Sequence, residues 1–125
     1  MSFFKTKPRK TDRLFSQYIR GKVDYRCEYC GKDCSEKKQG IHASHYFGRR
    51  KESVRFDTRN VHAFCFSCHD KLGHGEDRDK YKEFMISKLG EQGFAKLLID
   101  SNTTKKRDDV LDELYIRELL KEIKD

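Results

Sequence analysis

The sequence has one proline, no tryptophan and no long run of hydrophobic residues. A single proline excludes collagen-like and mucin-like chains, which are rich in that residue. A membrane-spanning helix needs roughly 18 consecutive apolar residues, and no segment approaches that length. Lys5, Lys7, Arg9 and Lys10 also interrupt the segment after Met1, so it lacks the features of a hydrophobic targeting signal. We therefore expect a soluble, intracellular protein.

Hydrophobic residues are scarce as well, since they form 35% of the 125 residues whereas charged residues form 39%. This length predicts one domain, or one small module with a helical extension. The core of such a module is modest, so a structural metal ion would add folding free energy that hydrophobic burial does not supply. The composition therefore favours a small fold that a metal stabilises.

The net charge of +7 is unevenly distributed along the chain. Residues 1–26 contain eight basic and two acidic side chains, and we interpret residues 1–10 as a flexible basic arm. A second basic stretch contains Arg49, Arg50, Lys51, Arg55 and Arg59. Such clusters attract polyanions, of which nucleic acid is the commonest. The alternative is a solvated surface that keeps the protein in solution.

Hydrophobic spacing in the N-terminal half predicts one helix and two short strands. The helix is expected to begin at Thr11 or Asp12, either of which is a suitable cap, and to end at Gly21. Strands are expected at 41–47 and 54–56, where aromatic and β-branched residues gather. This half of the chain is therefore expected to supply the β part of a small α+β fold.

The C-terminal part of the chain is predicted to be helical. One amphipathic stripe ends at Gly90, and a second, shorter one follows it. A last helix carries apolar residues around a wide arc, at Leu111, Leu114, Tyr115, Ile116, Leu119, Leu120 and Ile123. This arc is broader than a helix that faces solvent needs. We expect the last helix to pack on the N-terminal helix or on a second subunit, which would make the protein a homodimer.

Four of the five cysteines form two Cys-x-x-Cys pairs, Cys27 with Cys30 and Cys65 with Cys68. In an intracellular chain, two such pairs favour a zinc site over a disulfide scaffold or a redox dithiol. Each pair directs two thiolates towards one point, and together they complete a tetrahedral site with four sulfur ligands. Because the protein would fill all four positions, this Zn²⁺ would be structural. Cys34 is left over as a bystander or an alternative ligand.

Three polar residues, His45, Asn60 and His69, lie between and directly after the cysteine pairs. Phosphodiester hydrolysis needs a base that activates water, a divalent cation, and a group that orients the base. Neutral imidazole suits the base near pH 7. An amide carbonyl can accept the proton on the other ring nitrogen, and a second imidazole can bind the cation. We assign His42 and His62 a structural role.

The segments around these residues resemble a known family. Residues 60–69 read Asn-Val-His-Ala-Phe-Cys-Phe-Ser-Cys-His and are similar to the second half of an HNH (ββα-metal, or His-Me finger) endonuclease motif. Together with Ala-Ser-His-Tyr-Phe-Gly-Arg-Arg at 43–50 and Val-Arg-Phe-Asp at 54–57, they resemble the phage NinG/Rap recombination proteins more closely. Leu-Phe-Ser at 14–16 and Ile-Arg at 19–20 are also similar to that family.

This resemblance implies a zinc-stabilised ββα-metal nuclease core over residues 11–76, with flanking helices and a helical extension over 77–125. It implies that His45 is the general base, Asn60 the orienting asparagine and His69 a ligand of a catalytic Mg²⁺ or Mn²⁺. The substrate would be DNA, including branched recombination intermediates, in the cytoplasm of a bacterium or a phage-infected host cell. The second basic stretch would then bind the DNA backbone rather than read bases.

One position departs from the commonest HNH pattern, which has an aspartate directly before the base as a second metal ligand. This chain has Ser44 there, and a hydroxyl is a poor Mg²⁺ ligand beside a carboxylate. Asn60, Asp57 and His74 are the candidates for the second ligand. The alternative to a nuclease is a non-catalytic zinc module that binds nucleic acid through a degenerate HNH site. A third interpretation is a phage accessory protein whose C-terminal helix recruits a partner.

Overall fold

Residues 7–73 and 77–123, which the computed structural model describes, contain four α-helices and one two-stranded antiparallel sheet. The elements are α1 (Lys10–Gly21), β1 (Ile41–His45), β2 (Val61–Cys65), α2 (Phe66–Gly73), α3 (Arg78–Ser101) and α4 (Asp109–Leu120). Short 3₁₀ turns lie at Lys38–Gly40, Glu52–Val54 and Lys121–Ile123. The prediction of a small α+β fold is confirmed.

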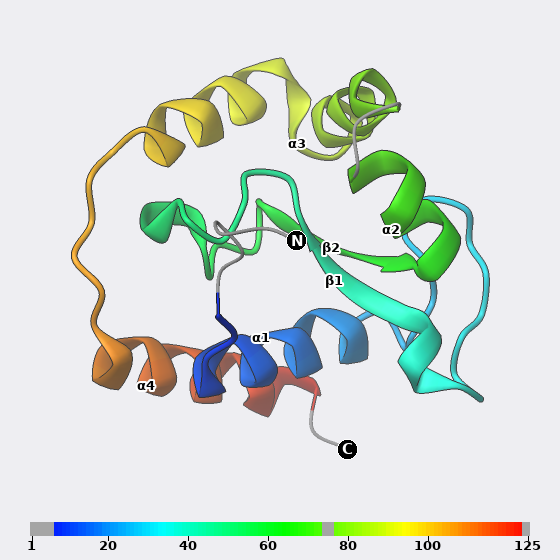
Figure 1. The fold of residues 1–125 in the computed structure, drawn as a ribbon, viewed down its shortest axis with the longest axis horizontal. Coiled ribbons are helices and arrows are strands. Elements are labelled where there is room, and N and C mark those ends of the chain that lie inside the picture. Colours follow the sequence, from blue (N-terminus) through cyan, green and yellow to red (C-terminus); the bar gives the residue numbers. More distant parts are fainter. Residues whose placement is uncertain (1–6, 74–76, 124–125) are drawn as a thin grey trace.

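The sheet lies between helices on both sides (Figure 1). Helix α1 packs against β1 and β2 from one side, and α4 lies alongside α1. On the other side, the ring of Tyr81 in α3 lies 5.3 Å from the ring of Phe64 in β2, measured between centroids. His45, at the end of β1, pairs with Val61, at the start of β2. The chain segment that joins the two strands therefore begins and ends beside His45.

Helix α1 forms because its apolar residues recur on one face, where Ile19 is fully buried. The prediction that Thr11 or Asp12 caps this helix is wrong. The helix begins at Lys10, and Arg9 is the cap residue. The carboxylate of Asp12 accepts a hydrogen bond from the backbone N–H of Arg9 at 2.7 Å. Asp12 therefore stabilises the helix from its third position, as in one half of a capping box.

The strand predicted at 54–56 is also wrong, because Val54 ends a 3₁₀ turn there. The partner of β1 is β2, in the segment that leads into the second cysteine pair. All five residues of β2 are buried. A strand that is buried on both faces lacks the alternation of apolar and polar residues by which a half-exposed strand is recognised.

Helix α3 contains a kink at Gly90, whose φ of 79° lies in the left-handed region that glycine adopts readily. The prediction that an amphipathic stripe ends at this glycine and that a second one follows is confirmed. Tyr81 and Met85 are buried before the kink, and Phe94 and Leu97 are buried after it. The kink lets the first half of α3 pack on β2 through Tyr81, while the second half packs through Phe94 on Tyr46 and Phe47, which follow β1.

Helix α4 packs along α1, which is one of the two arrangements that the sequence predicts. Its residue Ile116 is fully buried. The hydroxyl group of Tyr18 in α1 donates a hydrogen bond to Oε1 of Glu122, just beyond α4, at 2.9 Å. Within the described ranges, none of the helices combines the length and the apolar composition that crossing a bilayer requires.

Candidate metal centre and histidine-lined hollow

Four cysteines from three parts of the fold converge on one point. Cys27 and Cys30 lie between α1 and β1, Cys65 ends β2, and Cys68 lies in the first turn of α2. Their Sγ atoms all lie within 4.8 Å of one another. The prediction that the two Cys-x-x-Cys pairs form one cluster is therefore confirmed.

The first pair owes its geometry to a tight turn. The backbone N–H of Gly31 donates to the carbonyl of Cys27 at 2.9 Å, and Gly31 has a φ of 83°. The backbone N–H of Cys30 donates to Sγ of Cys27 at 3.4 Å. Burial alone would raise the pKa of Cys27, but hydrogen bonds from the backbone of Cys30 and Cys65 outweigh it and lower the pKa to about 7. This favours the thiolate, which is the metal-binding form.

The donor set fits Zn²⁺. Zn–S bonds of about 2.3 Å in a tetrahedron place the sulfur atoms about 3.8 Å apart. The Sγ atoms of Cys30 and Cys65, one from each pair, are 3.8 Å apart. The thiol of Cys34 lies outside the cluster, near the carbonyls of Lys32 and Gly40. Four protein ligands leave no position for water, so an ion here would stabilise the fold and take no part in hydrolysis.

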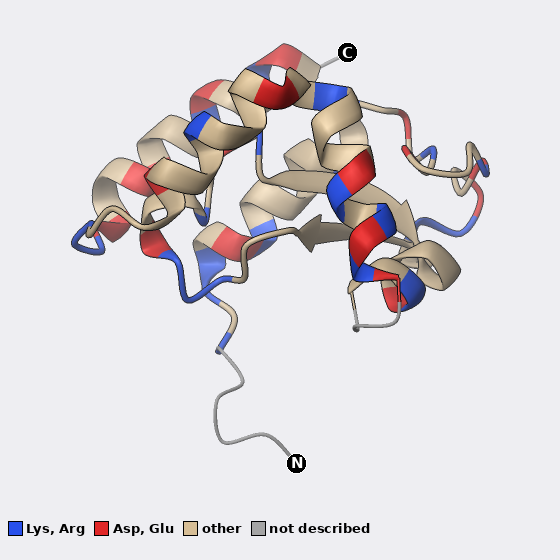
Figure 2. Cartoon of the chain, turned by 90° about the horizontal axis from the view of Figure 1, so that it is seen from above, with Lys and Arg blue, Asp and Glu red and all other residues tan. Residues whose placement is uncertain are grey.

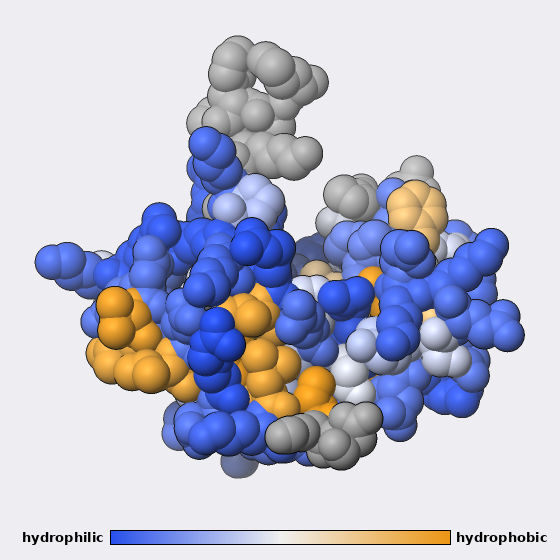
Figure 3. Space-filling model, turned by 90° about the horizontal axis from the view of Figure 1, so that it is seen from below, coloured by the Kyte–Doolittle hydropathy of each residue, from blue (hydrophilic) through white to orange (hydrophobic). Residues whose placement is uncertain are grey.

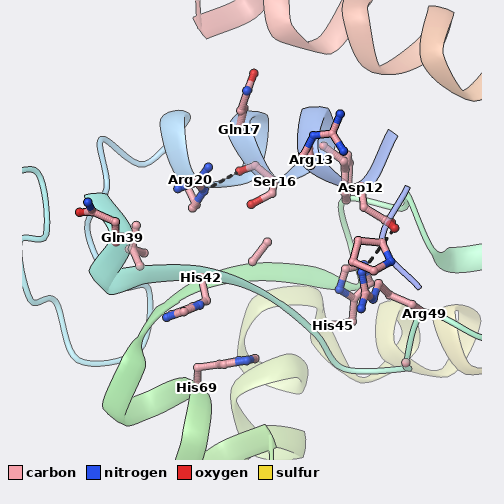
Figure 4. A pocket seen from close by; sticks show the side chains of 15 residues that line it. Asp12, Arg13, Ser16, Gln17, Arg20, Gln39, His42, His45, Arg49 and His69 are labelled. Carbon is pink, nitrogen blue, oxygen red and sulfur yellow. Dashed lines mark hydrogen bonds and ion pairs between the residues drawn. The ribbon is translucent and has the colours of Figure 1, made fainter. Parts of the chain in front are cut away.

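A hollow of about 700 Å³ lies between α1 on one side and β1 with α2 on the other (Figure 4). His42 and His45 from β1 and His69 from α2 line one wall of this hollow. Ser16 and Arg20 from α1 line the opposite wall. The structure thus places the two histidines for which the sequence predicts catalytic roles, His45 and His69, in the same hollow.

The ring of His45 is held by the main chain. Its Nε2 lies 3.0 Å from the carbonyl oxygen of Arg55. A carbonyl only accepts, so Nε2 carries the proton and Nδ1 keeps the lone pair. Burial lowers the pKa of His45 from the ordinary 6.5 to about 4, which outweighs the opposing effect of the hydrogen bond to Arg55. The imidazole is therefore neutral at pH 7 and able to accept a proton.

This depressed pKa predicts a pH-dependent stability. Between the folded value of about 4 and the ordinary value of 6.5 for His45, the unfolded chain binds more protons. The free energy of unfolding should therefore fall as the pH drops below 6.5. Between about pH 7.5 and 5.5 this single group accounts for about 1 kcal/mol. Urea unfolding at saturating zinc should show that His45→Gln lacks this part of the pH dependence, and identical profiles would contradict the assignment.

The side chain of Asn60 binds the main chain of the loop between β1 and β2. It is fully buried, and its Oδ1 accepts a hydrogen bond from the backbone N–H of Phe47 at 2.8 Å. Its Nδ2 donates to the carbonyls of Phe47 and Val54 at 2.8 and 3.1 Å. The sequence predicts that its amide carbonyl accepts the second proton of the base, but the carbonyl of Arg55 is the acceptor. Asn60 instead fastens the loop that carries Arg55.

His69 lies in the first half of α2, directly after a cysteine of the metal cluster. Its ring stacks on the ring of His42, with 5.2 Å between centroids and an interplanar angle of 11°. The hydroxyl of Ser44, at the position where the HNH pattern has an aspartate, is buried and lies 2.8 Å from the hydroxyl of Tyr81. Ser44 is therefore turned towards α3 and away from the hollow.

Two of the three residues that the sequence offers as a second cation ligand bind other groups within the fold. The carboxylate of Asp57 binds the guanidinium of Arg59 at 2.6 Å. The amide of Asn60 forms hydrogen bonds with main-chain groups of Phe47 and Val54. His74 lies outside the described residues. The sequence reasoning assigns His42 a structural role, yet the structure places His42 beside His69.

Two of the five basic residues predicted to bind DNA, Arg55 and Arg59, form ion pairs with acidic side chains of the same chain. The side chain of Arg55 is 1% exposed, and its guanidinium contacts the carboxylate of Asp12 at 2.6 and 3.0 Å. Arg59 contacts Asp57 and Asp100 at 2.6 and 2.8 Å. These ion pairs join α1 and α3 to the loop between the strands. Their geometry gives both arginines a structural role and does not support phosphate binding.

Of the other three basic residues of this stretch, Arg50 and Lys51 are exposed. Arg49 lines the hollow, and its guanidinium also contacts the carboxylate of Asp12 at 3.4 Å. The sequence reasoning missed the polar face of α1, formed by Arg13, Ser16, Gln17 and Arg20, which also lines the hollow. Its signal is the spacing of three, four and seven residues, opposite the buried apolar face. Elsewhere, along α3 and α4, basic and acidic residues alternate and form no single basic face (Figure 2).

Comparison with known proteins extends over nearly the whole chain. The family model described as the bacteriophage lambda NinG protein matches residues 4–125. No curated protein and no solved structure gives a match. The matched segment contains both cysteine pairs and the three histidines of the hollow. This chain therefore belongs to the bacteriophage lambda NinG protein family.

Proposed function

We propose that this protein is a metal-dependent endonuclease that hydrolyses phosphodiester bonds in DNA, with branched recombination intermediates among its substrates. Membership of a phage NinG family supports a role in recombination. The observation that carries the proposal is the state of His45: a neutral ring, fixed through Nε2, in a hollow that also holds His42 and His69. A general base needs both neutrality and a fixed direction.

In this proposal, His45 accepts a proton at Nδ1 from the water that attacks the phosphorus atom. Burial opposes the imidazolium ion that forms, and the negative charge of the bound phosphate offsets part of this cost. His69, with His42 beside it, would hold a divalent cation, which supplies charge stabilisation to the reacting phosphate. Mg²⁺ prefers oxygen ligands and keeps much of its water shell, and Mn²⁺ accepts a nitrogen ligand more readily, so we expect Mn²⁺ to support more cleavage.

Both walls of the hollow carry positively charged side chains that can contact the phosphates of a DNA backbone. Arg20 lies on the α1 wall and Arg49 on the other, and both line the hollow with the histidines. Contacts of this kind bind phosphate without reading sequence. We therefore expect binding to weaken steeply as the salt concentration rises.

The test of the proposal is cleavage of a four-way junction, a flap and a linear duplex with Mn²⁺ or Mg²⁺. We expect EDTA to abolish cleavage, and His45→Ala to reduce the rate by about 10²- to 10⁴-fold, which is the usual contribution of a general base. Zinc content and DNA binding should stay unchanged. The matched control is His62→Gln, because His62 is buried against the ring of Phe84 at 5.1 Å and lies outside the hollow. Full activity of His45→Ala would refute the role of His45.

The second candidate is a non-catalytic zinc module that binds nucleic acid. The burial of Ser44 against Tyr81 favours it, because this position supplies no ligand to a cation in the hollow. In that case the wild-type protein binds DNA in a salt-sensitive manner, and no divalent cation supports cleavage. The same set of substrates therefore separates the two functions.

A further inference from the structure

Helix α4 has a second apolar face, on the side away from α1. Its members are Val110, Leu111, Leu114 and Tyr115, which are 72%, 61%, 59% and 46% exposed. The view from below shows apolar surface over the layer that α1 and α4 form, divided by hydrophilic side chains (Figure 3). Contiguous apolar patches on a protein surface commonly mark interaction sites.

The exposed face continues into charged residues at both ends. At 100° per residue, Glu118 lies in the same arc of the helix as Leu111 and Leu114, opposite the buried Ile116. Arg107 lies just before the helix. Both charged side chains are exposed, and each forms an exposed ion pair within the chain, Arg107 with Asp109 at 2.7 Å and Glu118 with Lys121 at 2.8 Å. The apolar residues thus lie between one exposed basic side chain and one exposed acidic side chain. Exposed ion pairs within a chain contribute little free energy, so both side chains can exchange their partners for a partner in a second copy.

We propose that the α4 helix of a second copy of this chain covers this face, in an antiparallel pair with two-fold symmetry. In one register, Leu111 meets Leu114 of the second copy, and Val110 meets its Tyr115. The same register sets Arg107 against Glu118 of the second copy, and symmetry repeats each contact. A parallel pair would instead oppose like charges, Glu118 with Glu118. Antiparallel packing also sets the helix dipoles in opposite directions.

This self-complementarity favours a second copy over an unrelated partner, because one stripe supplies both halves of the interface. Four large side chains from each copy bury less area than the roughly 1,200–2,000 Å² of a standard interface. We therefore expect a weak dimer that forms at roughly micromolar concentration. The proposal concerns assembly alone and does not depend on catalysis.

Sedimentation equilibrium of the zinc-loaded chain tests the proposal. The apparent mass should rise from 14.9 kDa towards twice that value as the concentration increases. Leu111→Ser should weaken association at least about tenfold, because it removes two symmetric apolar contacts. The matched control is Ile99→Ser on α3, since Ile99 is 66% exposed and lies outside the patch. This control should associate like the wild type.

Orientation is tested by exchanging the charges. Arg107→Glu and Glu118→Arg should each weaken association about fivefold, and the double variant should recover to within about twofold of the wild type. Circular dichroism and zinc content should show that every variant remains folded. A wild type that stays monomeric at about 500 µM, or dimers that survive Leu111→Ser, would overturn the proposed interface. A double variant no stronger than the single variants would overturn the antiparallel register.

Discussion

Replacing Cys65 by serine is expected to release the structural zinc and to unfold most of the chain. Structural zinc supplies about 10–16 kcal/mol in small domains, which matches or exceeds the total stability of about 5–15 kcal/mol of a typical domain. Cys65 ends β2 and adjoins α2, so the loss of its ligand releases the segment that carries His69. Zinc measured per chain and far-ultraviolet circular dichroism should fall together.

The control for this prediction is Cys34→Ser. Cys34 is buried like Cys27 and Cys65, at 7% exposed, but its thiol lies outside the cluster of four. This variant should keep its zinc and its fold. A Cys65→Ser protein that remains folded without zinc would contradict the structural role of the ion. Loss of zinc from Cys34→Ser would show that the ligand set is different.

Replacing Arg55 by methionine is expected to lower the free energy of unfolding by about 3–5 kcal/mol, since this is the usual cost of removing one partner of a buried ion pair. The change leaves the carboxylate of Asp12 buried with fewer partners. Hydrogen bonding and charge from Arg55 outweigh burial and lower the pKa of Asp12. Urea unfolding at saturating zinc and neutral pH measures the loss.

A double variant, Arg55→Met with Asp12→Asn, tests whether the buried charge is the cause. It should recover a large part of the stability, because the interior then no longer contains a carboxylate whose remaining contacts are Arg49 and the backbone N–H of Arg9. Arg107→Met is the control, because Arg107 forms an exposed pair with Asp109 and its loss should change stability little. Equal losses in the single and double variants would show that Arg55 acts through packing rather than charge.

The cysteine cluster could be predicted from the sequence because two short repeats of fixed spacing define it. The end of an amphipathic stripe at Gly90 follows from periodicity in the same way. The wide apolar arc of α4 predicts that the helix packs on another surface, but it does not distinguish α1 from a second subunit. Strand β2 was missed because it is buried on both faces and shows no alternation. The structural role of Arg55 was missed because its partner, Asp12, is 43 residues away in the chain. A basic stretch in the sequence does not show which of its members an acidic side chain neutralises.

The candidate site was predicted in part. His45 and His69 line one hollow, as the motif suggests. His42 also lines it and stacks on His69, but a lone histidine on a strand has no characteristic spacing by which the sequence could single it out. The sequence predicts that Asn60 orients the ring of His45 because only side chains, and not individual main-chain groups, distinguish one residue from another in a sequence. The acceptor that the structure shows is a main-chain group, which every residue possesses. Side-chain patterns therefore identify His45 as a candidate base but do not identify the main-chain group that holds its ring.

The carbonyl that fixes His45 has a consequence for mutagenesis. No amino-acid substitution at position 55 deletes this oxygen, so alanine scanning reports only on the Arg55 side chain, including its ion pair with Asp12. Removing the interaction itself requires editing the backbone. Replacing the amide that follows position 55 by an ester through chemical synthesis would make the carbonyl a poorer acceptor and let the ring turn. Evolution, too, can exchange the residue at this position without losing the group that aims the imidazole.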